Sequence, residues 1–303
     1  MHVHVLGAAA GGGFPQWNCN CPQCDGVRRG TIRATPRTQS SIAISANGDD
    51  WLLVNASPDV RQQLNRASPL RTPGEARRTP FRAALLIDSQ IDHSAGLLIL
   101  REGEPLDVYC TEPAFEDLTT GFPVLRMLDH YCGVRRHAVQ PGGEPFTIPR
   151  VPGLSFTALP IRSKAPPYSP HREDPHPGDN IALWVEDTAT GGRLFYAPGL
   201  GAMDDALKAR MRGADCLLVD GTFWTETEMI DQGLGQKPAA AMGHLPQSGE
   251  GGMMELLNNY NNARKVLIHI NNSNPILRED SDQRAQLDAA GIEVAYDGMD
   301  IHL

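Results

Sequence analysis

The chain has 303 residues, of which 41% are hydrophobic and 21% are charged, a composition that suits one large globular domain or two small ones. A formal net charge of −9 argues against electrostatic binding of nucleic acid, and an aromatic content of 6% argues against a stacking platform for single strands. No apolar run approaches the roughly 18–20 residues that a membrane helix needs, so no membrane partner is expected.

The start of the chain, MHVHVLGAAAGGGF, lacks a basic segment followed by a long apolar segment, so we expect no signal peptide. This pattern predicts a cytoplasmic protein. In the cytoplasm the six cysteines are more typical of reduced thiols or metal ligands than of disulfides.

The first part of the chain is rich in short apolar runs. Residues 2–13 (HVHVLGAAAGGG) predict a strand followed by a glycine turn, which is not the G-x-G-x-x-G pattern of a dinucleotide site. Residues 40–59 predict a hairpin that turns at ANGDD. Residues 81–90 predict an apolar strand, and residues 92–103 predict a helix with leucine and isoleucine on one face.

Strands and helices then alternate toward the end of the chain. Strands are expected over 105–112, 154–161, 180–187, 193–199 and 293–303, partly helical sequence over 114–131, and a helix followed by a strand over both 204–223 and 249–276. A Pro-rich insertion at 163–180 separates two of the strands, and such an insertion in a compact domain is often a lid or a binding loop. Early hairpins followed by this alternation predict a mixed α/β protein with its strands between helices.

Three cysteines, Cys19, Cys21 and Cys24, lie in the loop 17–26 with the spacing C-x-C-x-x-C. Thiolates this close can bind one tetrahedral zinc ion, and thiolate-rich zinc sites are more often structural than catalytic. Unpaired loop cysteines are the plainer alternative, although exposed thiols at this density invite oxidation, and a redox dithiol is a further one. We predict a structural zinc site whose fourth ligand comes from elsewhere in the chain or from solvent.

Several polar residues follow predicted strands, where α/β proteins collect binding groups. Asp92 and His93 stand between a predicted strand and a helix, and His269 ends the apolar run KVLIHI. Asp220 ends the strand CLLVD, and His244 precedes a predicted helix. A single histidine of this kind is more often a packed or capping residue than a ligand, so the argument depends on the group.

The segment AALLIDSQIDHSAGLLILREG resembles the second motif of the metallo-β-lactamase superfamily, T-H-x-H-x-D-H-x-x-G. Asp92, His93 and Gly96 match this motif, whereas Asp88 and Gln90 stand where the two histidines of the first metal site are usual. The segments WLLVNASPDVRQQL, CLLVDGTF, MGHLPQ and KVLIHINNSNP resemble other parts of the superfamily, and the last of them carries His269 over as the final motif histidine. The resemblance implies a single domain over 1–303 with the αββα sandwich of the metallo-β-lactamase type.

The departures from the superfamily pattern affect the expected mechanism. Asn55 stands where an aspartate is usual, Arg162 falls near the expected third-motif histidine, and YAPGLG has no aspartate where a G-D-T would supply a bridging carboxylate. A two-metal hydrolase needs both sites occupied, with ions ~3.5–4 Å apart. Hydrolysis at a binuclear centre is therefore not expected.

The residues that survive are Asp92, His93 and His269. Two imidazoles and one carboxylate are the ligand set of mononuclear iron(II) oxygenases, so the resemblance and the departures together predict Fe²⁺ at the active site. Over its full length the chain is most similar to a superfamily member that acts in the biosynthesis of pyrroloquinoline quinone (PQQ). That resemblance implies a small-molecule substrate, the cross-linked Glu-Tyr precursor, and O₂-dependent hydroxylation of its tyrosine ring.

Two other functions are open at this point. The degenerate motif could bind no catalytic metal, and the protein would then be a carrier or transport protein for PQQ or its precursor. The chain could also serve as a scaffold for other PQQ-pathway enzymes, although it offers no large amphipathic docking helix.

Supporting residues are predicted on weaker grounds. In the similar phosphodiesterase branch a histidine three positions after the last active-site histidine completes the C-x-C-x-x-C site, and that position here is Asn272, a possible fourth ligand. Asp220 and His244 are expected to contact the substrate. Three cations are expected to bind the carboxylates of an acidic substrate, because arginine presents a bidentate fork to a carboxylate; they are Arg37, Arg162 and Lys164. His4, His171 and His176 are alternative zinc ligands, and the insertion at 163–180 could close over the site.

Overall fold

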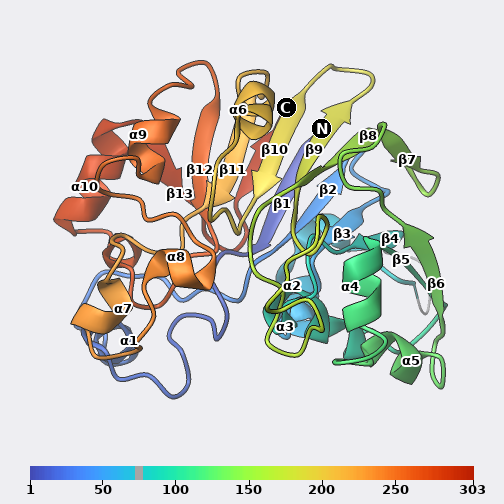
Figure 1. Cartoon of the computed structure of the whole chain (residues 1–303), viewed down its shortest axis with the longest axis horizontal. Helices are drawn as coiled ribbons and strands as arrows, with labels where there is room; N and C mark the ends of the chain where they lie inside the picture. Colours follow the sequence, from blue (N-terminus) through green and yellow to red (C-terminus); the bar gives the residue numbers. More distant parts are fainter. Residues whose placement is uncertain (72–77) are drawn as a thin grey trace.

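Two seven-stranded sheets form the centre of the molecule, and helices cover their outer faces (Figure 1). The structure is a computed structural model that describes residues 1–71 and 78–303. The strands of the first sheet, in spatial order, are β14 (Asp300–His302), β1 (His2–Gly7), β2 (Ser41–Ser45), β3 (Leu52–Val54), β4 (Ala83–Leu85), β5 (Leu106–Cys110) and β6 (Val134–Ala138). Those of the second sheet are β13 (Ile292–Val294), β12 (Arg264–Ile268), β11 (Cys216–Asp220), β10 (Arg193–Ala197), β9 (Ile181–Asp187), β8 (Val151–Pro160) and β7 (Phe146–Ile148).

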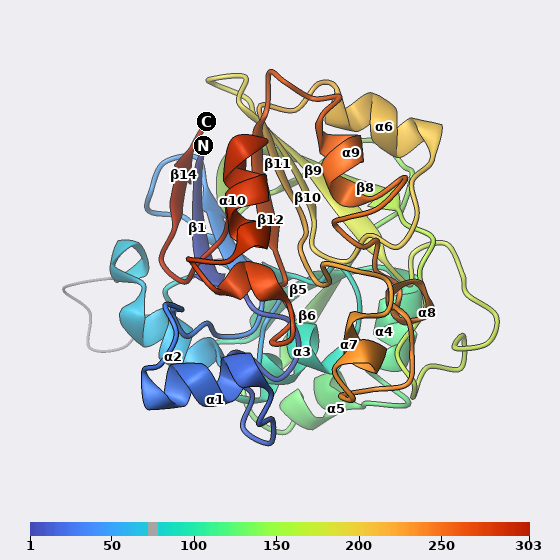
Figure 2. The ribbon, with the colours of Figure 1, turned by 90° about the vertical axis from the view of Figure 1, so that its left-hand side faces the viewer.

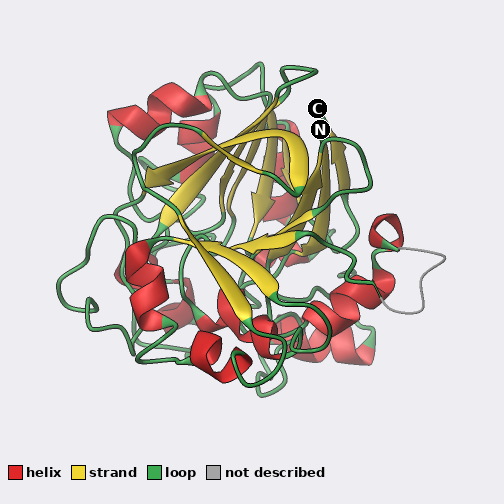
Figure 3. Cartoon of the chain, turned by 90° about the vertical axis from the view of Figure 1, so that its right-hand side faces the viewer, coloured by secondary structure: helices red, strands yellow, loops and turns green. Residues whose placement is uncertain are grey.

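The helices are short and lie outside the two sheets, as Figure 3 shows with the strands in yellow and the helices in red. They are α1 (Pro22–Arg29), α2 (Val60–Arg66), α3 (Ile91–Ser94), α4 (Glu112–Asp117), α5 (Val124–Leu128), α6 (Asp205–Met211), α7 (Glu228–Asp231), α8 (Ala239–Met242), α9 (Met253–Leu257) and α10 (Asp282–Ala289), with 3-10 turns at Ser68–Leu70, Ala95–Leu98 and Pro275–Leu277. Side chains of α6, α9 and α10 pack on the second sheet, and those of α2, α4 and α5 pack on the first. Within residues 1–71 and 78–303, no helix combines the length and apolar character that crossing a membrane requires.

The central strands are apolar throughout because both of their faces are buried. In β11, Leu218 faces the core between the sheets, whereas Leu217 and Val219 face the outer helices. In β12, Val266 faces the inner core and Leu267 the outer layer. Side chains that alternate between two buried faces produce the continuous apolar runs seen in the sequence. The prediction of an αββα sandwich is confirmed.

Strand direction brings the polar strand ends to one edge of the molecule. β4 runs parallel to β3 and β5, and β11 runs parallel to β10 and β12. The hairpin predicted over 40–59 is confirmed as β2 and β3, which pair with Ile42 opposite Val54. The segments that follow β4, β11 and β12 therefore emerge where parallel strands of each sheet end together, which is where α/β proteins bind ligands.

One expectation for local structure is wrong, and two strands had no prediction. The predicted helix over 92–103 is a single turn, α3, continued by the 3-10 turn Ala95–Leu98. The short helix is consistent with the packing of Gly96. The backbone at Gly96 lies directly against the backbone of Ala56 and Ser57, and these contacts fix the direction of the chain after α3. Strands β6 and β7 were also not expected, since the sequence of β6, VRRHA, is polar and partly exposed.

Replacement of Gly96 by alanine tests this close packing. The added Cβ would lie 2.1 Å from the Ser57 carbonyl oxygen and 2.6 Å from that of Ala56, so the backbone would have to move. We expect Gly96→Ala to lower the free energy of unfolding by about 1–3 kcal/mol in urea titrations. Gly213→Ala is the matched control, because its nearest contact would be an ordinary 3.4 Å to the Trp184 ring. Equal unfolding midpoints for the two variants would contradict the packing argument.

Candidate metal centre

Three chain segments bring one carboxylate and three imidazoles together at this edge of the sandwich. Asp92 and His93 lie on α3, after β4, and His269 directly follows β12. His244 follows α8, whose C-terminal Gly243 has a φ of 90° and directs the chain into the site. The positive φ at Gly243 is available at little cost only to glycine, which ends α8 one residue before the histidine.

Asp92 lies between two histidines. Its Oδ2 is 3.2 Å from Nε2 of His269 and 4.0 Å from Nε2 of His93. The two imidazole rings are edge to face, with centroids 5.3 Å apart. Both histidines are buried, whereas the Asp92 side chain is 19% exposed, so one side of the group faces outward. The structure thus brings together the three residues that the sequence predicted as the active-site ligands.

Asp88 orients His93 instead of replacing a metal ligand. Both carboxylate oxygens of Asp88 lie 2.9 Å from Nδ1 of His93, so the Nδ1–H donates to the carboxylate. Nε2 of His93 is buried and has no hydrogen-bond partner among the described residues. A histidine that donates through one ring nitrogen to a carboxylate and presents the other as a bare lone pair is typical of a metal ligand.

His269 adopts a left-handed backbone conformation, with a φ of 61°. For a residue other than glycine this conformation costs of order 1–3 kcal/mol and persists only where the surroundings impose it. Here the turn ends β12 and allows Ile270 to pair with the chain after β1, through Ile270 N to the Ala8 carbonyl and Ala10 N to the Ile270 carbonyl. The strained residue is also the one whose side chain contacts Asp92.

A hydroxyl that the sequence analysis did not identify joins two of the histidines. Thr222 Oγ1 lies 2.9 Å from Nδ1 of His269, 3.0 Å from Nδ1 of His244 and 2.6 Å from Oδ1 of Asp220. The other oxygen of Asp220 is 2.7 Å from Nδ1 of His244. Asp220 and His244 therefore belong to the wall of the centre, and the D-G-T sequence that begins at the last residue of β11 is the signal that could have identified Thr222.

The charges of the centre shift the pKa values of its groups in opposite directions. Burial opposes ionisation of Asp92, but the adjacent His93 and His269 hold the pKa of this carboxyl well below its usual range. Burial likewise opposes protonation of His93, but Asp88 and Asp92 raise its pKa to about 9. Two carboxylates thus stabilise a positive charge on the His93 imidazole.

The donor set fits a metal ion. With Nδ1 of His93 bound to Asp88 and Nδ1 of His269 bound to Thr222, each ring presents Nε2 toward Asp92. Lone pairs on two nitrogens and a carboxylate oxygen repel one another unless a proton or a metal ion lies between them. Two imidazoles and one carboxylate are the facial ligand set of mononuclear iron(II) enzymes, and zinc accepts the same atoms.

The three loop cysteines form a second cluster. Their ligand atoms lie within 4.8 Å of one another, and all three residues are buried. Cys21 caps α1 by accepting from the Cys24 amide, which brings both sulfurs to one helix end. Burial raises the pKa of the Cys24 thiol to about 12. A metal ion would overcome this cost, because a coordinating thiol is deprotonated outright.

Asn272 lies over the three sulfurs. Its side-chain nitrogen is 3.1 Å from Sγ of Cys19, 3.4 Å from that of Cys24 and 3.9 Å from that of Cys21. Asn272 is thus the polar group nearest to the position of a fourth ligand, and a rotated amide would present its oxygen there. The alternative histidines bind elsewhere: His4 contacts Asp300, His171 contacts Asp179 and Glu116, and His176 contacts Asp174.

The three predicted cations have different environments. Arg37 is buried, and its guanidinium donates to the Ala295 and Thr35 carbonyls, so the predicted substrate contact is not supported. Arg162 and Lys164 are exposed. Ser163 between them lies against Gly243, so these two cations are near the His244 loop.

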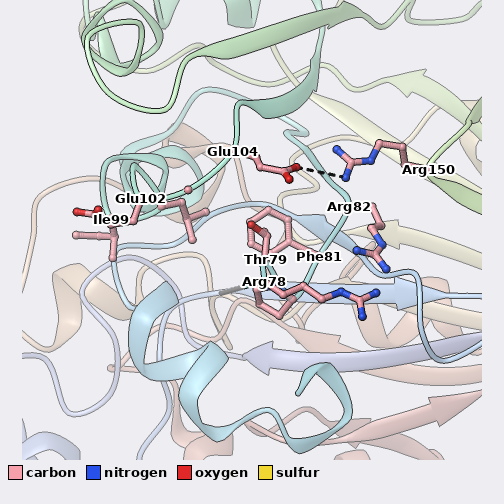
Figure 4. A pocket seen from close by; sticks show the side chains of 11 residues that line it. Arg78, Thr79, Phe81, Arg82, Ile99, Glu102, Glu104 and Arg150 are labelled. Atoms are coloured by element: carbon pink, nitrogen blue, oxygen red, sulfur yellow. Dashed lines mark ion pairs between the residues drawn. The ribbon is translucent and has the colours of Figure 1, made fainter. Parts of the chain in front are cut away.

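Two surface cavities differ in whether a residue of this centre lines them. One of about 540 Å³ lies beside His244 and is lined mainly by residues 225–227 and 244–252. Another, of about 780 Å³, is shown in Figure 4 and lies among segments that precede β4, β5 and β8. Its lining contains Arg82, Arg150 and Glu104 but no histidine or cysteine, so it offers no comparable metal ligands.

The fold and the metal centre define the class of protein, and comparisons with known proteins agree. The family model described as the beta-lactamase superfamily domain matches residues 50–270, and the chain belongs to this superfamily. Coenzyme PQQ synthesis protein B from Methylobacillus flagellatus is 60% identical over 306 residues, and its counterpart from Azotobacter vinelandii is 60% identical over 303, each match covering 100% of both chains. Within the superfamily, the chain therefore belongs to the family of coenzyme PQQ synthesis protein B.

A solved structure extends the comparison. The crystal structure of Zn²⁺-bound PqqB from Methylobacterium extorquens is 40% identical, covers 100% of both chains and superimposes with a TM-score of 0.89. This likeness confirms the predicted metallo-β-lactamase fold over the whole chain.

Loss of one sulfur tests the cysteine cluster. We expect Cys21→Ser to remove one zinc ion per chain, measured by inductively coupled plasma mass spectrometry. Because a metal bound only by the folded state stabilises it by about 4 kcal/mol at a thousandfold excess over Kd, the variant should also unfold at lower temperature. Cys132→Ser is the control, since Cys132 belongs to the outer core of the first sheet, whereas the three cysteines belong to that of the second. Wild-type zinc content in Cys21→Ser would contradict the assignment.

The raised pKa of His93 predicts pH-dependent metal binding at Asp92, His93 and His269. Below about pH 9 the metal-free imidazole carries a proton that an incoming ion must displace. One displaced proton makes the apparent affinity rise about tenfold per pH unit up to that pH and level off above it. Calorimetric titration in buffers of different ionisation enthalpy should detect the released proton at pH 7. A pH-independent affinity between pH 6 and 8 would contradict this prediction.

Proposed function

We propose that the chain acts in the synthesis of coenzyme PQQ, as a mononuclear iron oxygenase that hydroxylates the tyrosine ring of the cross-linked Glu-Tyr precursor. The observation that supports this proposal best is the buried, unpartnered Nε2 of His93 facing Asp92 and His269. Ferrous iron at these three ligands would supply a redox centre with open positions for O₂ and substrate. The Cys19, Cys21 and Cys24 cluster, with Asn272, would hold a structural zinc ion.

The reaction balances with one external reductant. One oxygen atom of O₂ enters the new C–O bond of the ring, the displaced ring hydrogen leaves as a proton, and the other oxygen atom leaves as water. The two electrons that this stoichiometry needs come from a small-molecule reductant supplied with O₂. The overall change converts a phenol into a catechol, which is the oxidation level from which a quinone can form.

The hydrogen bonds of Asp88 favour a site for one metal ion rather than two. Both of its carboxylate oxygens are engaged with His93, so this residue orients a ligand in place of supplying a second site. Gln90 uses its backbone nitrogen to bond Asp88 and its backbone carbonyl to bond His93. Asp88 and Gln90, which stand where the superfamily motif has histidines, therefore hold His93 in position.

The insertion at 163–180 packs against the turn that carries His93 and would close one side of the site. Tyr168 donates its hydroxyl proton to the Ser89 carbonyl, and Asn180 pairs with Asp88 in an isolated bridge, so both contacts reach the turn that carries His93. His171 anchors the middle of the insertion between Asp179 and Glu116. An insertion held at these points would exclude water from one side of the centre.

The substrate would be bound through its carboxylates. Arg162 and Lys164 are exposed cations beside the His244 loop, and a polycarboxylate precursor would be attracted to them. His244, held by Asp220, would present its remaining ring nitrogen toward the cavity beside it. Other PQQ-pathway enzymes are the proposed macromolecular partners.

Substrate turnover with controlled oxygen tests the proposal. Protein reconstituted with Fe²⁺ should consume O₂ and add 16 mass units per hydroxylation, detected by mass spectrometry, and ¹⁸O₂ should supply the added atom. His93→Ala should lose at least a hundredfold in rate, because removal of the ligand removes the centre. Arg82→Ala, which alters an arginine of the cavity in Figure 4, is the control and should turn over normally.

The same experiment distinguishes a carrier from an enzyme. A carrier would bind PQQ or its precursor with wild-type affinity when it is loaded with zinc, consume no O₂, and be indifferent to His93→Ala. That combination of results would contradict the oxygenase proposal.

A further inference from the structure

We propose that Thr222 is a positioning residue whose hydroxyl fixes the tautomers of His269 and His244, so that both rings present Nε2 as a bare lone pair. The inference rests on the proposed role of His269 as a metal ligand. It concerns a residue that contacts neither the metal position nor the substrate position directly.

The proton count around Thr222 leads to this inference. Four polar atoms lie within 3.0 Å of its Oγ1: Oδ1 of Asp220, Nδ1 of His244, Nδ1 of His269 and the His269 carbonyl oxygen. A hydroxyl has one proton and two lone pairs. Oδ1 of Asp220, at 2.6 Å, and the carbonyl oxygen can only accept, so the hydroxyl proton goes to one of them.

Both imidazole nitrogens must then donate. The two lone pairs of the hydroxyl are left to face two Nδ1 atoms, and each contact is favourable only if that nitrogen carries a proton. For His244 the same conclusion follows independently, because its Nδ1 is also 2.7 Å from Oδ2 of Asp220, which only accepts. A single hydroxyl thereby sets the protonation pattern of two rings that stack with centroids 5.3 Å apart.

The consequence for His269 is specific. With its proton on Nδ1, the ring directs the Nε2 lone pair at Asp92, the same arrangement that Asp88 imposes on His93. The opposite tautomer would place a proton between His269 and Asp92 and occupy the atom that a metal needs. Thr222 therefore has for His269 the function that Asp88 has for His93, although one partner is neutral and the other is a carboxylate.

Burial makes the hydroxyl hard to replace by solvent. Asp220 is fully buried, and Thr222 is 2% exposed. The Thr222 backbone is also fixed, because its amide donates to Oδ1 of Asp220 and its carbonyl accepts from Asn271. A variant that lacks only the hydroxyl would leave Nδ1 of His269 facing a methyl group.

Thr222→Val and Thr222→Ser form the matched pair for the test, since valine keeps the shape without the hydroxyl and serine keeps the hydroxyl. The probe is Co²⁺ alone, titrated into protein that retains zinc at the cysteines, with d–d absorption as the readout. We expect Thr222→Val to weaken Co²⁺ binding about tenfold to a hundredfold, as loss of the partner of a ligating histidine does. Thr222→Ser should stay within about threefold of the wild type.

A measurement on the wild type keeps the inference testable if the valine variant fails to fold. In ¹⁵N-histidine-labelled protein with Zn²⁺ at both sites, the Nδ1–H protons of His269 and His244 should appear as downfield signals that exchange slowly with water. Signals from Nε2–H at either ring, or equal Co²⁺ affinity in the valine and serine variants, would overturn the proposal. Weak Co²⁺ binding in Thr222→Val combined with absent hydroxylation in every protein would refute only the proposed function.

Discussion

The left-handed turn at His269 is the constraint on which both candidate metal centres depend. Four consecutive residues leave the end of β12 in different directions with different tasks. His269 contacts Asp92, Ile270 pairs with the chain after β1, Asn271 donates to the Thr222 carbonyl, and Asn272 covers the cysteine sulfurs. The two centres therefore share one short segment of chain, in which Asn272 follows His269 by three residues.

Through Asn272, the cysteine cluster also contacts the segment that carries His269. The chain from Gly11 to Cys24 passes Asp92, because a Cβ on Gly11 would lie 3.3 Å from Oδ2 of Asp92. The same loop ends at the sulfurs beneath Asn272. An ion at the cysteines would therefore hold this loop in place both beside Asp92 and beside the His269–Asn272 segment. Figure 2 shows α1 and α3 on the same lower side of the molecule.

The sequence predicted strands between helices because strands buried on both faces leave continuous apolar runs, as β11 and β12 do, and the resemblance to the metallo-β-lactamase superfamily implied the αββα sandwich. Strand ends made Asp92, His93 and His269 candidates, the resemblance predicted them as one ligand set, and the structure places them together. The sequence could not predict features that depend on distant partners. Gly96 shortens α3 through contacts with Ala56 and Ser57, and Arg37 turns to carbonyls contributed partly by Ala295.

Thr222 shows the same limit within the site. Threonine is common after strands, and its importance here arises only when β11 and β12 place Asp220 and His269 on either side of one hydroxyl. The role of Asp88 is similar, because the motif alone presents it as a lost histidine, whereas the folded chain makes it the partner of His93. A residue that replaces a metal ligand of the motif can thus hydrogen-bond a ligand that remains and fix its orientation.

The chemistry of the donors separates the functions of the two centres. Three thiolates form a soft set that suits zinc, whereas two imidazoles and a carboxylate accept several divalent metals, with zinc bound more tightly than ferrous iron in the general affinity order. Zinc in a relative such as the Methylobacterium extorquens protein is what that order favours for either donor set. Zinc has no accessible second oxidation state, so a centre filled with it would keep the geometry set by Asp88 and Thr222 and lack only the ability to exchange electrons. The identity of the ion, rather than the arrangement of the ligands, would then decide whether this site binds its substrate or oxidises it.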